Sequence, residues 1–378
     1  MNFKNPDQLL LNNVESSIDI SGRSILNKEK FLNVLQEIYL LENLNIFRNR
    51  ISTLRNSILF PVKERDEIFN INSNKNNVSF KKKHLIEDFN QMLESMTIDR
   101  AKYYLKRLQK GVEEVKTSKI NDINLNRWKE YEEIFLDSLW VVPKRDSSGV
   151  HMASYWGNFI PQIPQQMLLR YTKKGDWVLD TFVGSGTSLI ECKKLGRNGM
   201  GIELSSEVAQ KARDLIDKQY SEFNVSTEIV VGDSKNIDIS SKLKNHNIKQ
   251  VQLLIMHPPY HDIIKFTDDD RDLSNTQSTD DFLSMFGEVV ENATPLLEKG
   301  RYFALVIGDK YSKGEWIPLG FYCMREVLNR GYTLKSIVIK NFEDTKGKRN
   351  QKSLWRYRAL VGGFYIFKHE YIFIFKKS

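Results

Sequence analysis

The sequence predicts an α/β fold of the doubly wound type, preceded by a mainly helical N-terminal domain. After residue 150, short apolar segments alternate with helical patterns, and the first segment, residues 177–180, leads through a glycine turn into a helical stretch, residues 187–195. Before that point the apolar residues recur at helical spacing. We therefore predict two domains, residues 1–150 and residues 151–378.

The N-terminal domain is predicted to be built from helices. Three sets of apolar residues recur at helical spacing. They are Phe31, Leu35, Ile38 and Leu41; Tyr104, Leu105, Leu108, Val112 and Val115; and Trp128, Tyr131, Ile134, Phe135 and Leu139. A polar insert at residues 70–78 precedes the basic run Lys81-Lys-Lys83. Each set marks one expected helix, with the insert as a loop between helices.

The glycine turn predicts a binding site for a nucleoside-containing ligand. Gly184 and Gly186 let the backbone turn sharply into a helix, whose first N–H groups are left free for a carboxylate or phosphate. The next strand, residues 199–204, places Glu203 about twenty residues further on, where a carboxylate can accept hydrogen bonds from both hydroxyls of a ribose. A third strand, residues 228–233, ends in Asp233, where an adenine amino group could be read. Three successive strands thus end in acidic residues at one edge of the sheet.

A fourth strand, residues 251–256, leads into the tetrapeptide His257-Pro-Pro-Tyr260. Two consecutive prolines have a fixed φ and no backbone N–H, so their segment exposes rigid carbonyls. The Pro258 carbonyl and the His257 side chain are therefore candidate acceptors for an amine. The Tyr260 ring offers a face on which a base could stack, worth roughly 1–3 kcal/mol. The alternative is a strand that ends in a Pro-Pro turn with an aromatic plug.

The remaining residues predict scaffold. Apolar residues from Phe282 to Leu297 recur at helical spacing, and a strand follows at residues 301–309. Residues 318–329 predict a further helix that ends before Gly331. Two more strands are expected at residues 334–340 and 369–375. The acidic stretch at residues 267–272 is interpreted as a lid or a solvated turn.

These motifs resemble those of the DNA amino-methyltransferases, which methylate cytosine at N4 or adenine at N6 with S-adenosylmethionine. The family's donor-binding turn reads Asp-Pro-Phe-x-Gly-Ser-Gly-Thr, and this chain has Asp180-Thr-Phe-Val-Gly-Ser-Gly-Thr187. The family's catalytic tetrapeptide is Asp, Asn or Ser followed by Pro-Pro and an aromatic residue. The segment at residues 156–164, followed by residues 168–171, looks like the family's additional donor-binding segment. The resemblance covers residues 151–378.

The resemblance implies a Rossmann-like, seven-stranded methyltransferase sheet with a terminal antiparallel hairpin beside the catalytic strand. It also implies S-adenosylmethionine as the cofactor, no metal ion, and extrusion of the target base from the duplex. The implied cofactor-binding residues are Phe159, Ile160, Pro161, Asp180, Phe182, Gly184, Ser185, Gly186, Thr187, Glu203, Leu204, Asp233 and Ser234. The implied catalytic residues are His257, Pro258, Pro259 and Tyr260.

His257 is the main departure from the family pattern. Ser in this place usually accompanies cytosine chemistry and Asp or Asn accompanies adenine, so the histidine leaves the target base open. A neutral imidazole can accept a hydrogen bond from the amine, whereas an imidazolium cannot. If His257 accepts from the amine, methyl transfer is expected to fail as the pH falls through the pKa of this histidine, which is about 6.5 for an unperturbed imidazole. In the alternative, His257 only caps the strand and the Pro258 carbonyl polarises the amine.

The distribution of charge suggests where DNA would bind. The chain of 378 residues carries a formal net charge of +8. The segment at residues 346–358 combines cations, amides and aromatic residues, as expected of a loop that tracks phosphates. Its candidate contacts are Lys346, Lys348, Arg349, Lys352, Arg356 and Arg358. We expect the helical N-terminal domain, together with this loop, to read double-stranded DNA; the alternative is a docking or dimerisation domain.

Composition restricts the cellular setting. The two cysteines, Cys192 and Cys323, lie in apolar helical patterns, which excludes a disulfide framework and a zinc cluster. No apolar stretch suggests targeting or anchoring, so a cytoplasmic location without membrane contact is expected. The abundance of Asn, Lys and Ile suggests an AT-rich genome and hence a bacterial or phage source. The resemblance implies a restriction or defence protein as a candidate partner, and a monomer or homodimer is expected. An RNA amino-methyltransferase and a non-catalytic nucleic-acid-binding protein on the same scaffold remain alternatives.

Overall fold

The computed structural model describes residues 20–61, 67–71, 76–152, 155, 157–341 and 352–378. The chain divides into two units, one of residues 1–118 with 123–132 and the other of residues 119–122 with 133–378. Residues 133–150 thus lie with the second unit. Each unit has a hydrophobic core of its own, so the two are described separately.

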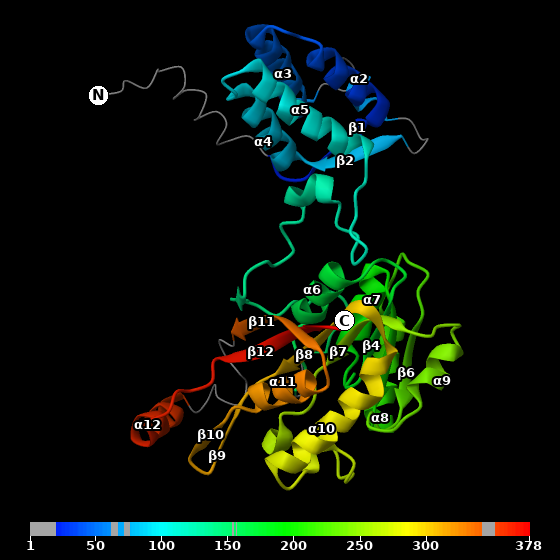
Figure 1. Ribbon diagram of the computed structural model, residues 1–378, viewed down its shortest axis with the longest axis vertical. Coiled ribbons are helices and arrows are strands. Elements are labelled where there is room, and N and C mark those ends of the chain that lie inside the picture. The colour runs from blue at the N-terminus through cyan, green and yellow to red at the C-terminus, as the bar shows by residue number, and fades with distance from the viewer. Residues whose placement is uncertain (1–19, 62–66, 72–75, 153–154, 156, 342–351) are drawn as a thin grey trace. The chain divides into compact units, whose positions relative to one another are not determined.

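Within its described residues, the first unit combines a small two-stranded sheet with four α-helices (Figure 1). Strands β1 (Arg23–Asn27) and β2 (Asn77–Lys81) pair antiparallel. The helices are α2 (Lys28–Tyr39), α3 (Leu44–Leu59), α4 (Lys82–Leu93) and α5 (Ile98–Glu113), with a 3-10 turn at Glu67–Phe69. Two of the three predicted helices are therefore present as α2 and α5. Their apolar stripes pack into one core with Phe47 of α3 and Phe89 of α4.

The third predicted N-terminal helix, around residues 128–139, is wrong. Residues Leu125–Glu130 form a 3-10 helix and Leu139–Trp140 form the short strand β3. A stable surface helix must bury one stripe of side chains. Trp128 and Leu139 are instead 64% and 59% exposed, so the apolar spacing here marks no buried face.

The second unit is built on an eight-stranded sheet with the order β3-β11-β12-β8-β7-β4-β5-β6. Its main strands are β4 (Trp177–Asp180), β5 (Asn198–Glu203), β6 (Thr227–Val231), β7 (Val251–Met256), β8 (Leu297–Ile307), β11 (Thr333–Asn341) and β12 (His369–Lys376). Strands β4 to β8 run parallel to one another, while β12 is antiparallel to both β8 and β11. The predicted seven strands and terminal hairpin are present, and β3 adds an eighth strand at the edge. The hairpin does not lie directly beside β7, because β8 lies between β12 and β7.

Helices cover both faces of this sheet, which confirms the doubly wound fold. Helices α6 (Gln162–Tyr171), α7 (Thr187–Leu195) and α8 (Ser206–Lys218) pack on one face, and α9 (Ile239–Lys244), α10 (Thr279–Ala293) and α11 (Leu319–Asn329) pack on the other. Figure 1 shows α10 and α11 along one face. In β7, Leu253 lies in the cluster of α6, whereas Leu254 lies in that of α10. Because neighbouring residues of a strand point to opposite faces, a strand buried on both sides is apolar throughout.

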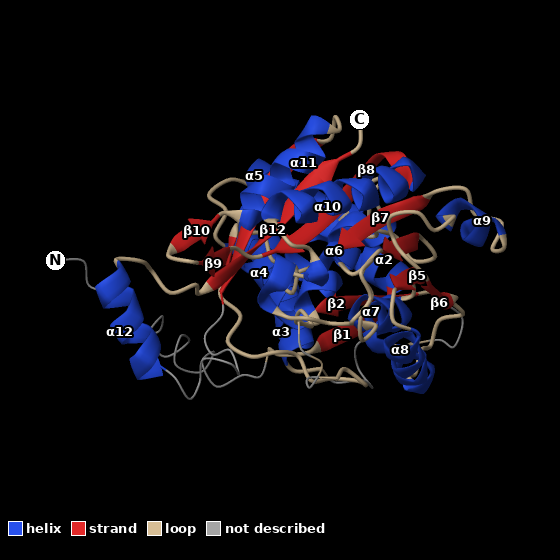
Figure 2. Ribbon diagram, turned by 90° about the horizontal axis from the view of Figure 1, so that it is seen from below, coloured by secondary structure: helices blue, strands red, loops and turns tan. Residues whose placement is uncertain are grey.

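Two further predictions need correction. Leu297 begins β8 instead of ending α10, because the 3-10 turn Thr294–Leu296, with its proline, ends the helix first. The basic segment at residues 346–358 is not a loop throughout, since Lys352–Gly362 form helix α12. This helix ends before Gly363, whose φ of 66° suits a residue that terminates a helix. Figure 2 shows α12 apart from the strands of the large sheet.

The chain leaves β4 toward β5 and β6 on one side and returns to β7 and β8 on the other. In open α/β sheets, ligands bind in the crevice that opens at the carboxyl ends of the strands at such a switch point. The turn after β4 and the tetrapeptide after β7 both lie at this edge. Small strands β9 (Lys310–Ser312) and β10 (Glu315–Ile317) form a separate hairpin. Among the described residues, every helix is too short or too polar to cross a membrane.

Candidate functional site

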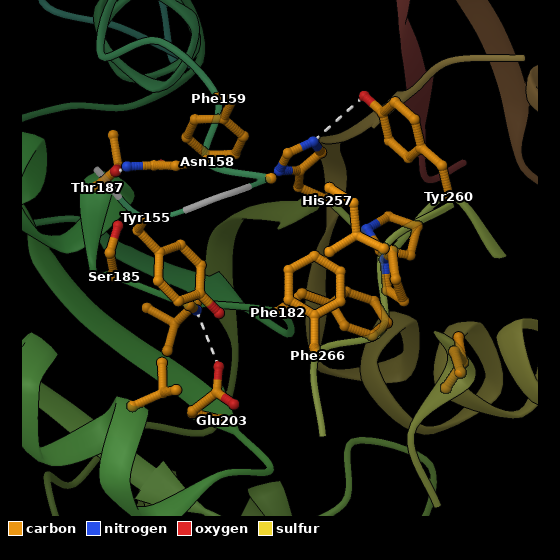
Figure 3. A pocket seen from close by; sticks show the side chains of 18 of the residues that line it. Tyr155, Asn158, Phe159, Phe182, Ser185, Thr187, Glu203, His257, Tyr260 and Phe266 are labelled. Carbon is orange, nitrogen blue, oxygen red and sulfur yellow. Dashed lines mark hydrogen bonds between the residues drawn. The ribbon is translucent and has the colours of Figure 1, made fainter. Parts of the chain in front are cut away.

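A cavity of about 1020 Å³ opens where β4, β5, β6 and β7 end. Drug-sized ligands occupy pockets of roughly 300–1,000 Å³, so this cavity is at the upper end of that range. Its walls come from the segment before α6, the glycine turn, the ends of β5 and β6, the tetrapeptide, and residues 263–273. The predicted residues that line it are Phe159, Ile160, Phe182, Gly184, Ser185, Thr187, Glu203, Leu204, Asp233, Ser234, His257, Pro258, Pro259 and Tyr260. The structure therefore brings the two motifs, some seventy residues apart in sequence, into one cavity (Figure 3).

Three predicted cofactor residues do not line the cavity: Pro161, Asp180 and Gly186. Pro161 is buried at the start of α6. Asp180 is buried beneath the glycine turn, where its carboxylate accepts hydrogen bonds from the Phe182 N–H (2.9 Å) and the Ser188 hydroxyl. Burial raises the pKa of Asp180 to about 6. These contacts give Asp180 a part in shaping the turn.

The turn itself depends on glycine. Gly184 and Gly186 have φ values of 49° and 83°, a region that side chains with a Cβ rarely adopt. A Cβ on Gly184 would lie 3.2 Å from the Tyr155 ring. Gly186 precedes α7, so the first N–H groups of that helix lie at the turn.

Glu203 is held by two backbone donors. Its Oε2 accepts from the Gly184 N–H at 3.0 Å and its Oε1 accepts from the Ser205 N–H at 2.9 Å. Each carboxylate oxygen can accept more than one hydrogen bond, so both oxygens keep capacity for a ligand. Burial raises the pKa of Glu203, and the two N–H groups partly offset this.

The cavity wall beside the glycine turn contains a hydroxyl group that lacks a hydrogen-bond partner among the described residues. Among the described residues, the hydroxyl of Ser185 is buried without a hydrogen-bond partner. Next to it, the Thr187 hydroxyl donates to Asn158 Oδ1 at 2.6 Å, and Asn158 Nδ2 donates to the Met152 carbonyl at 3.0 Å. Buried polar groups are nearly always hydrogen-bonded in native proteins. A ligand with a carboxylate or amino group at this place would supply the partner that Ser185 lacks.

Two aromatic side chains that the sequence analysis did not identify also line the cavity. Tyr155 and Phe266 stack with ring centroids 6.3 Å apart (Figure 3). Gly157 lies against Phe266, and a Cβ at this glycine would be 2.7 Å from the ring. The acidic stretch follows Phe266 and bonds within itself, because the Thr267 hydroxyl donates to Asp272 at 2.9 Å. The only signal in the sequence for these two cavity-lining rings was Gly157, a glycine that lies next to aromatic residues in the chain.

The residues after β6 form another side. Strand β6 ends at Val231, two residues earlier than predicted, and Asp233 follows at the cavity. Its Oδ1 accepts from the Lys235 N–H at 2.9 Å, and Lys235 Nζ lies 3.6 Å from its Oδ2. The Ser234 hydroxyl donates to the Thr181 carbonyl at 2.6 Å, which ties this segment to the glycine turn.

The tetrapeptide forms the opposite wall. The His257 ring is partly buried, 4.7 Å from the ring of Phe159, and its Nε2 lies 3.3 Å from the Tyr260 hydroxyl. Burial lowers the pKa of His257 to about 4; nearby Glu370 opposes this shift and Lys340 adds to it. The value of about 6.5 for an unperturbed imidazole therefore does not apply to His257. At neutral pH the imidazole is neutral and able to accept a hydrogen bond.

Tyr260 is anchored at both its ring and its hydroxyl. Its ring meets that of His257 edge-on, at 81°, and its hydroxyl donates to Glu370 Oε2 at 2.9 Å. The ring also lies against Gly308, where a Cβ would approach it to 2.8 Å. These contacts hold the tyrosine in one orientation at the cavity.

The predicted DNA-contacting residues are only partly placed. Lys346, Lys348 and Arg349 lie outside the described residues. Lys352 begins α12, on which Arg356 and Arg358 are exposed.

Trp355 of the same helix lines the cavity, with the Arg358 guanidinium 5.5 Å from its ring. In the first unit, Lys83 pairs with Glu132 at 2.8 Å, and Lys82 donates to the Leu59 carbonyl at 3.3 Å. Arg356 and Arg358 thus lie on a helix that lines the cavity, whereas Lys82 and Lys83 are bonded to residues of the first unit.

Comparison with known proteins agrees with these features. The family described as DNA methylase matches residues 14–214 and 251–378. Type II methyltransferase M.MjaII of Methanocaldococcus jannaschii is 44% identical over 57 residues, which are 15% of this chain and 10% of that protein. M.HpaI of Haemophilus parainfluenzae is 40% identical over 60 residues, 16% of this chain and 19% of that protein. M.BglI of Bacillus subtilis is 27% identical over 135 residues, 36% of either chain.

The matched segments therefore span well under half the length of these relatives. Among solved structures, TrmN from Thermus thermophilus is similar with a TM-score of 0.37 and 16% identity, over 58% of this chain and 49% of that one. A methyltransferase from Pyrococcus furiosus has a TM-score of 0.36 and 16% identity, over 60% of this chain and 87% of that one.

Proposed function

This chain belongs to the DNA methylase family, whose cofactor is S-adenosylmethionine, and we propose that it methylates the exocyclic amine of cytosine (N4) or adenine (N6) in double-stranded DNA. One observation carries the proposal: the glycine turn after β4 and the tetrapeptide after β7 line the same cavity. A donor held by the first motif would therefore lie next to an acceptor site formed by the second.

The residues around the glycine turn fit the cofactor. The N–H groups at the start of α7 and the unpartnered Ser185 hydroxyl suit its amino-acid end. Glu203 would accept from the ribose hydroxyls, and Asp233 and Ser234, which line the same cavity, would contact the adenine. When bound, S-adenosylmethionine supplies a methyl group already activated by its positively charged sulfur. The protein then has to align the amine with that methyl group and exclude water.

The tetrapeptide would prepare the amine. The lone pair of an exocyclic amine is conjugated into the base, so the nitrogen must be drawn toward tetrahedral geometry by hydrogen-bond acceptors. The Pro258 carbonyl and neutral His257 can each accept one N–H, and their attraction grows as positive charge develops on the nitrogen. As the methyl group passes to the nitrogen, its bond to the donor sulfur would break and leave a neutral thioether. The methylated nitrogen would then lose one proton. The low pKa makes His257 a weak base, so this proton would pass to solvent after the transfer.

Access to the base requires that it leave the duplex. Extrusion costs a few kcal/mol, which contacts in the cavity must offset. The edge of the cavity carries Trp355, and Arg356 and Arg358 extend from the same helix. An aromatic residue beside exposed cations suits an extruded strand, because the ring can stack while the cations meet phosphates.

The first unit is the proposed target-recognition part. Residues 232–250, between β6 and β7, carry the short helix α9 and hold no inserted domain. The family's other members described above are Type II methyltransferases, and we extend to this chain the proposal of a restriction or defence setting with a matching partner protein. His257 leaves cytosine and adenine equally open as targets.

The test is transfer of tritiated methyl groups from S-adenosylmethionine to nucleic acid. We expect label in double-stranded DNA, no label in RNA, and a loss of at least about a hundredfold on His257→Ala, the typical contribution of a catalytic hydrogen-bonding group. Cys323→Ser, at a buried residue of α11 that does not line the cavity, serves as the control and should keep its label. Label in RNA alone would redirect the proposal to RNA, and no label in either would contradict it.

A further inference from the structure

We infer that Glu370 and Lys340 are positioning residues that hold His257 in the tautomer whose Nδ1 accepts a hydrogen bond from the target amine. This inference rests on the proposed function, since it explains how a histidine can serve where Asp, Asn or Ser is usual. None of these side chains except His257 would touch the reacting atoms.

The arrangement begins with a charge pair inside the terminal hairpin. Lys340 of β11 and Glu370 of β12 are directly opposite each other in the antiparallel register. Lys340 Nζ lies 3.1 Å from Glu370 Oε1, and the two residues are only 5% and 4% exposed. Burying two charges costs several kcal/mol per ion, so such a pair is retained only where its geometry is good and the remaining lone pairs are bonded. The second carboxylate oxygen therefore needs a donor.

Tyr260 supplies that donor across an intervening strand. Its ring passes over Gly308, just beyond β8, and its hydroxyl reaches Glu370 Oε2 at 2.9 Å. A carboxylate can only accept, so the phenol proton lies between Tyr260 and Glu370. The tyrosine oxygen keeps its lone pairs and becomes an acceptor on its other side.

The acceptor faces His257. Nε2 of the imidazole lies 3.3 Å from the Tyr260 oxygen, and with the phenol proton committed to Glu370, the contact requires an N–H on Nε2. A neutral imidazole has one N–H, so Nδ1 is left with a free lone pair. In Figure 3 the second ring nitrogen of His257 points away from Tyr260. The hydrogen bonds that link His257, Tyr260 and Glu370 thus all donate toward Glu370. They leave the His257 Nδ1 lone pair as an acceptor at the cavity.

The substitution Glu370→Gln is expected to reverse this direction. Lys340 is a donor only, so the new amide turns its carbonyl to Lys340 and its NH₂ group to Tyr260. The tyrosine oxygen must then accept from the amide, and its proton passes to the bond with His257 Nε2. The proton of the imidazole moves to Nδ1, which can no longer accept from the amine. We expect the single-turnover rate of methyl transfer to fall at least about tenfold, the worth of one hydrogen bond, with cofactor affinity changed less than twofold.

The same substitution in a protein that carries His257→Asn distinguishes a positioning role of Glu370 from general structural support. In His257→Asn the acceptor is an amide carbonyl without tautomers, so adding Glu370→Gln should change the rate less than about twofold. In the natural background, Lys340→Met combined with Glu370→Gln removes the donor that fixes the orientation of the amide. The amide carbonyl can then turn to Tyr260 and accept its proton, so part of the lost rate of methyl transfer should return. Losses on Glu370→Gln that are equal in the natural and His257→Asn backgrounds would overturn the inference.

The tautomer can also be observed without any activity. Nitrogen-15 NMR of protein labelled in its histidine rings distinguishes a protonated from an unprotonated ring nitrogen, and His257→Asn identifies the His257 signals. We expect Nε2–H in the natural protein and Nδ1–H in Glu370→Gln. Nδ1–H, or a mixture, in the natural protein would overturn the inference even if Glu370→Gln does not fold. A protein that methylates nothing would contradict the proposed function alone, because the NMR result would still decide the tautomer.

Discussion

Acidification tests the role of His257, because the structure shifts its protonation far from the usual range. Burial lowers the pKa from 6.5 to about 4. This lowering of the pKa corresponds to about 3 kcal/mol against the charged form. The neutral ring is therefore expected to persist, and the acceptor with it, through the whole range from pH 8 to about 5.

The assay is the single-turnover rate of methyl transfer as a function of pH, divided by that of His257→Asn. The division removes other titrations that both proteins share, including that of Asp180, whose pKa burial raises to about 6. We expect a constant ratio from pH 8 to 5.5 and a decline toward pH 4. A ratio that halves near pH 6.5 would refute the reasoning, since it would show an unperturbed imidazole.

The same pKa predicts a difference in stability. Between pH 6.5 and about 4 the unfolded chain binds a proton at His257 that the folded protein does not. Folding stability from this group is therefore complete above pH 6.5 and is lost as the pH falls toward 4, by up to about 3 kcal/mol. Asp180 acts in the opposite sense, because its folded pKa is raised, so the folded state binds the extra proton between pH 3.8 and about 6. Urea unfolding of the natural protein and His257→Asn at pH 7 and 5 isolates the histidine, and an unchanged difference between the two proteins would contradict its lowered pKa.

Three further experiments test the cavity and its edge. Gly184→Ala adds roughly 1–2 kcal/mol of left-handed backbone strain and a Cβ 3.2 Å from a ring of the cavity wall, so calorimetry should show cofactor affinity reduced about tenfold. Gly175→Ala, with a φ of +82° in open space, should lose stability and keep that affinity; a loss of affinity in both would refute the assignment of the turn. Gly308→Ala places a Cβ 2.8 Å from the tetrapeptide tyrosine, and about 1–3 kcal/mol of overpacking should lower both the melting temperature and the methylation rate, whereas an unchanged rate would show that the tyrosine need not stay in place. Charge reversal of Arg356 and Arg358 should weaken DNA binding and reduce the slope of log affinity against log salt by about 0.9 per lost phosphate contact; an unchanged slope would exclude α12 from the interface.

The sheet could be predicted from sequence where burial and chain breaks act together. The boundaries of β7 were predicted correctly, because an apolar run buried on both faces ends at two prolines that cannot continue it. The helix after the glycine turn was also correct at both ends, since Gly186 and Gly196 have left-handed φ values on either side of it. Helices α3 and α4 were overlooked although their buried residues, such as Phe47 and Ile51, carry the expected spacing.

Features that depend on tertiary pairing could not be predicted. Glu370 and Lys340 meet because of the register between β11 and β12, which the turn residues and packing set and no local pattern encodes. A charged residue within an otherwise apolar strand was the only available signal, because such a residue must find a partner. The pKa of His257 likewise depends on burial created by segments distant in sequence. The site could thus be located from its motifs, while its electrostatics required the fold.

The most direct test of the account is long-read sequencing of DNA from cells that lack their own DNA methyltransferases and express this chain. The account predicts N4-methylcytosine or N6-methyladenine at one defined sequence, and unmodified DNA when the chain carries His257→Ala. DNA that stays unmodified although the natural chain is present and folded, or modification that is equal with and without His257, would contradict it.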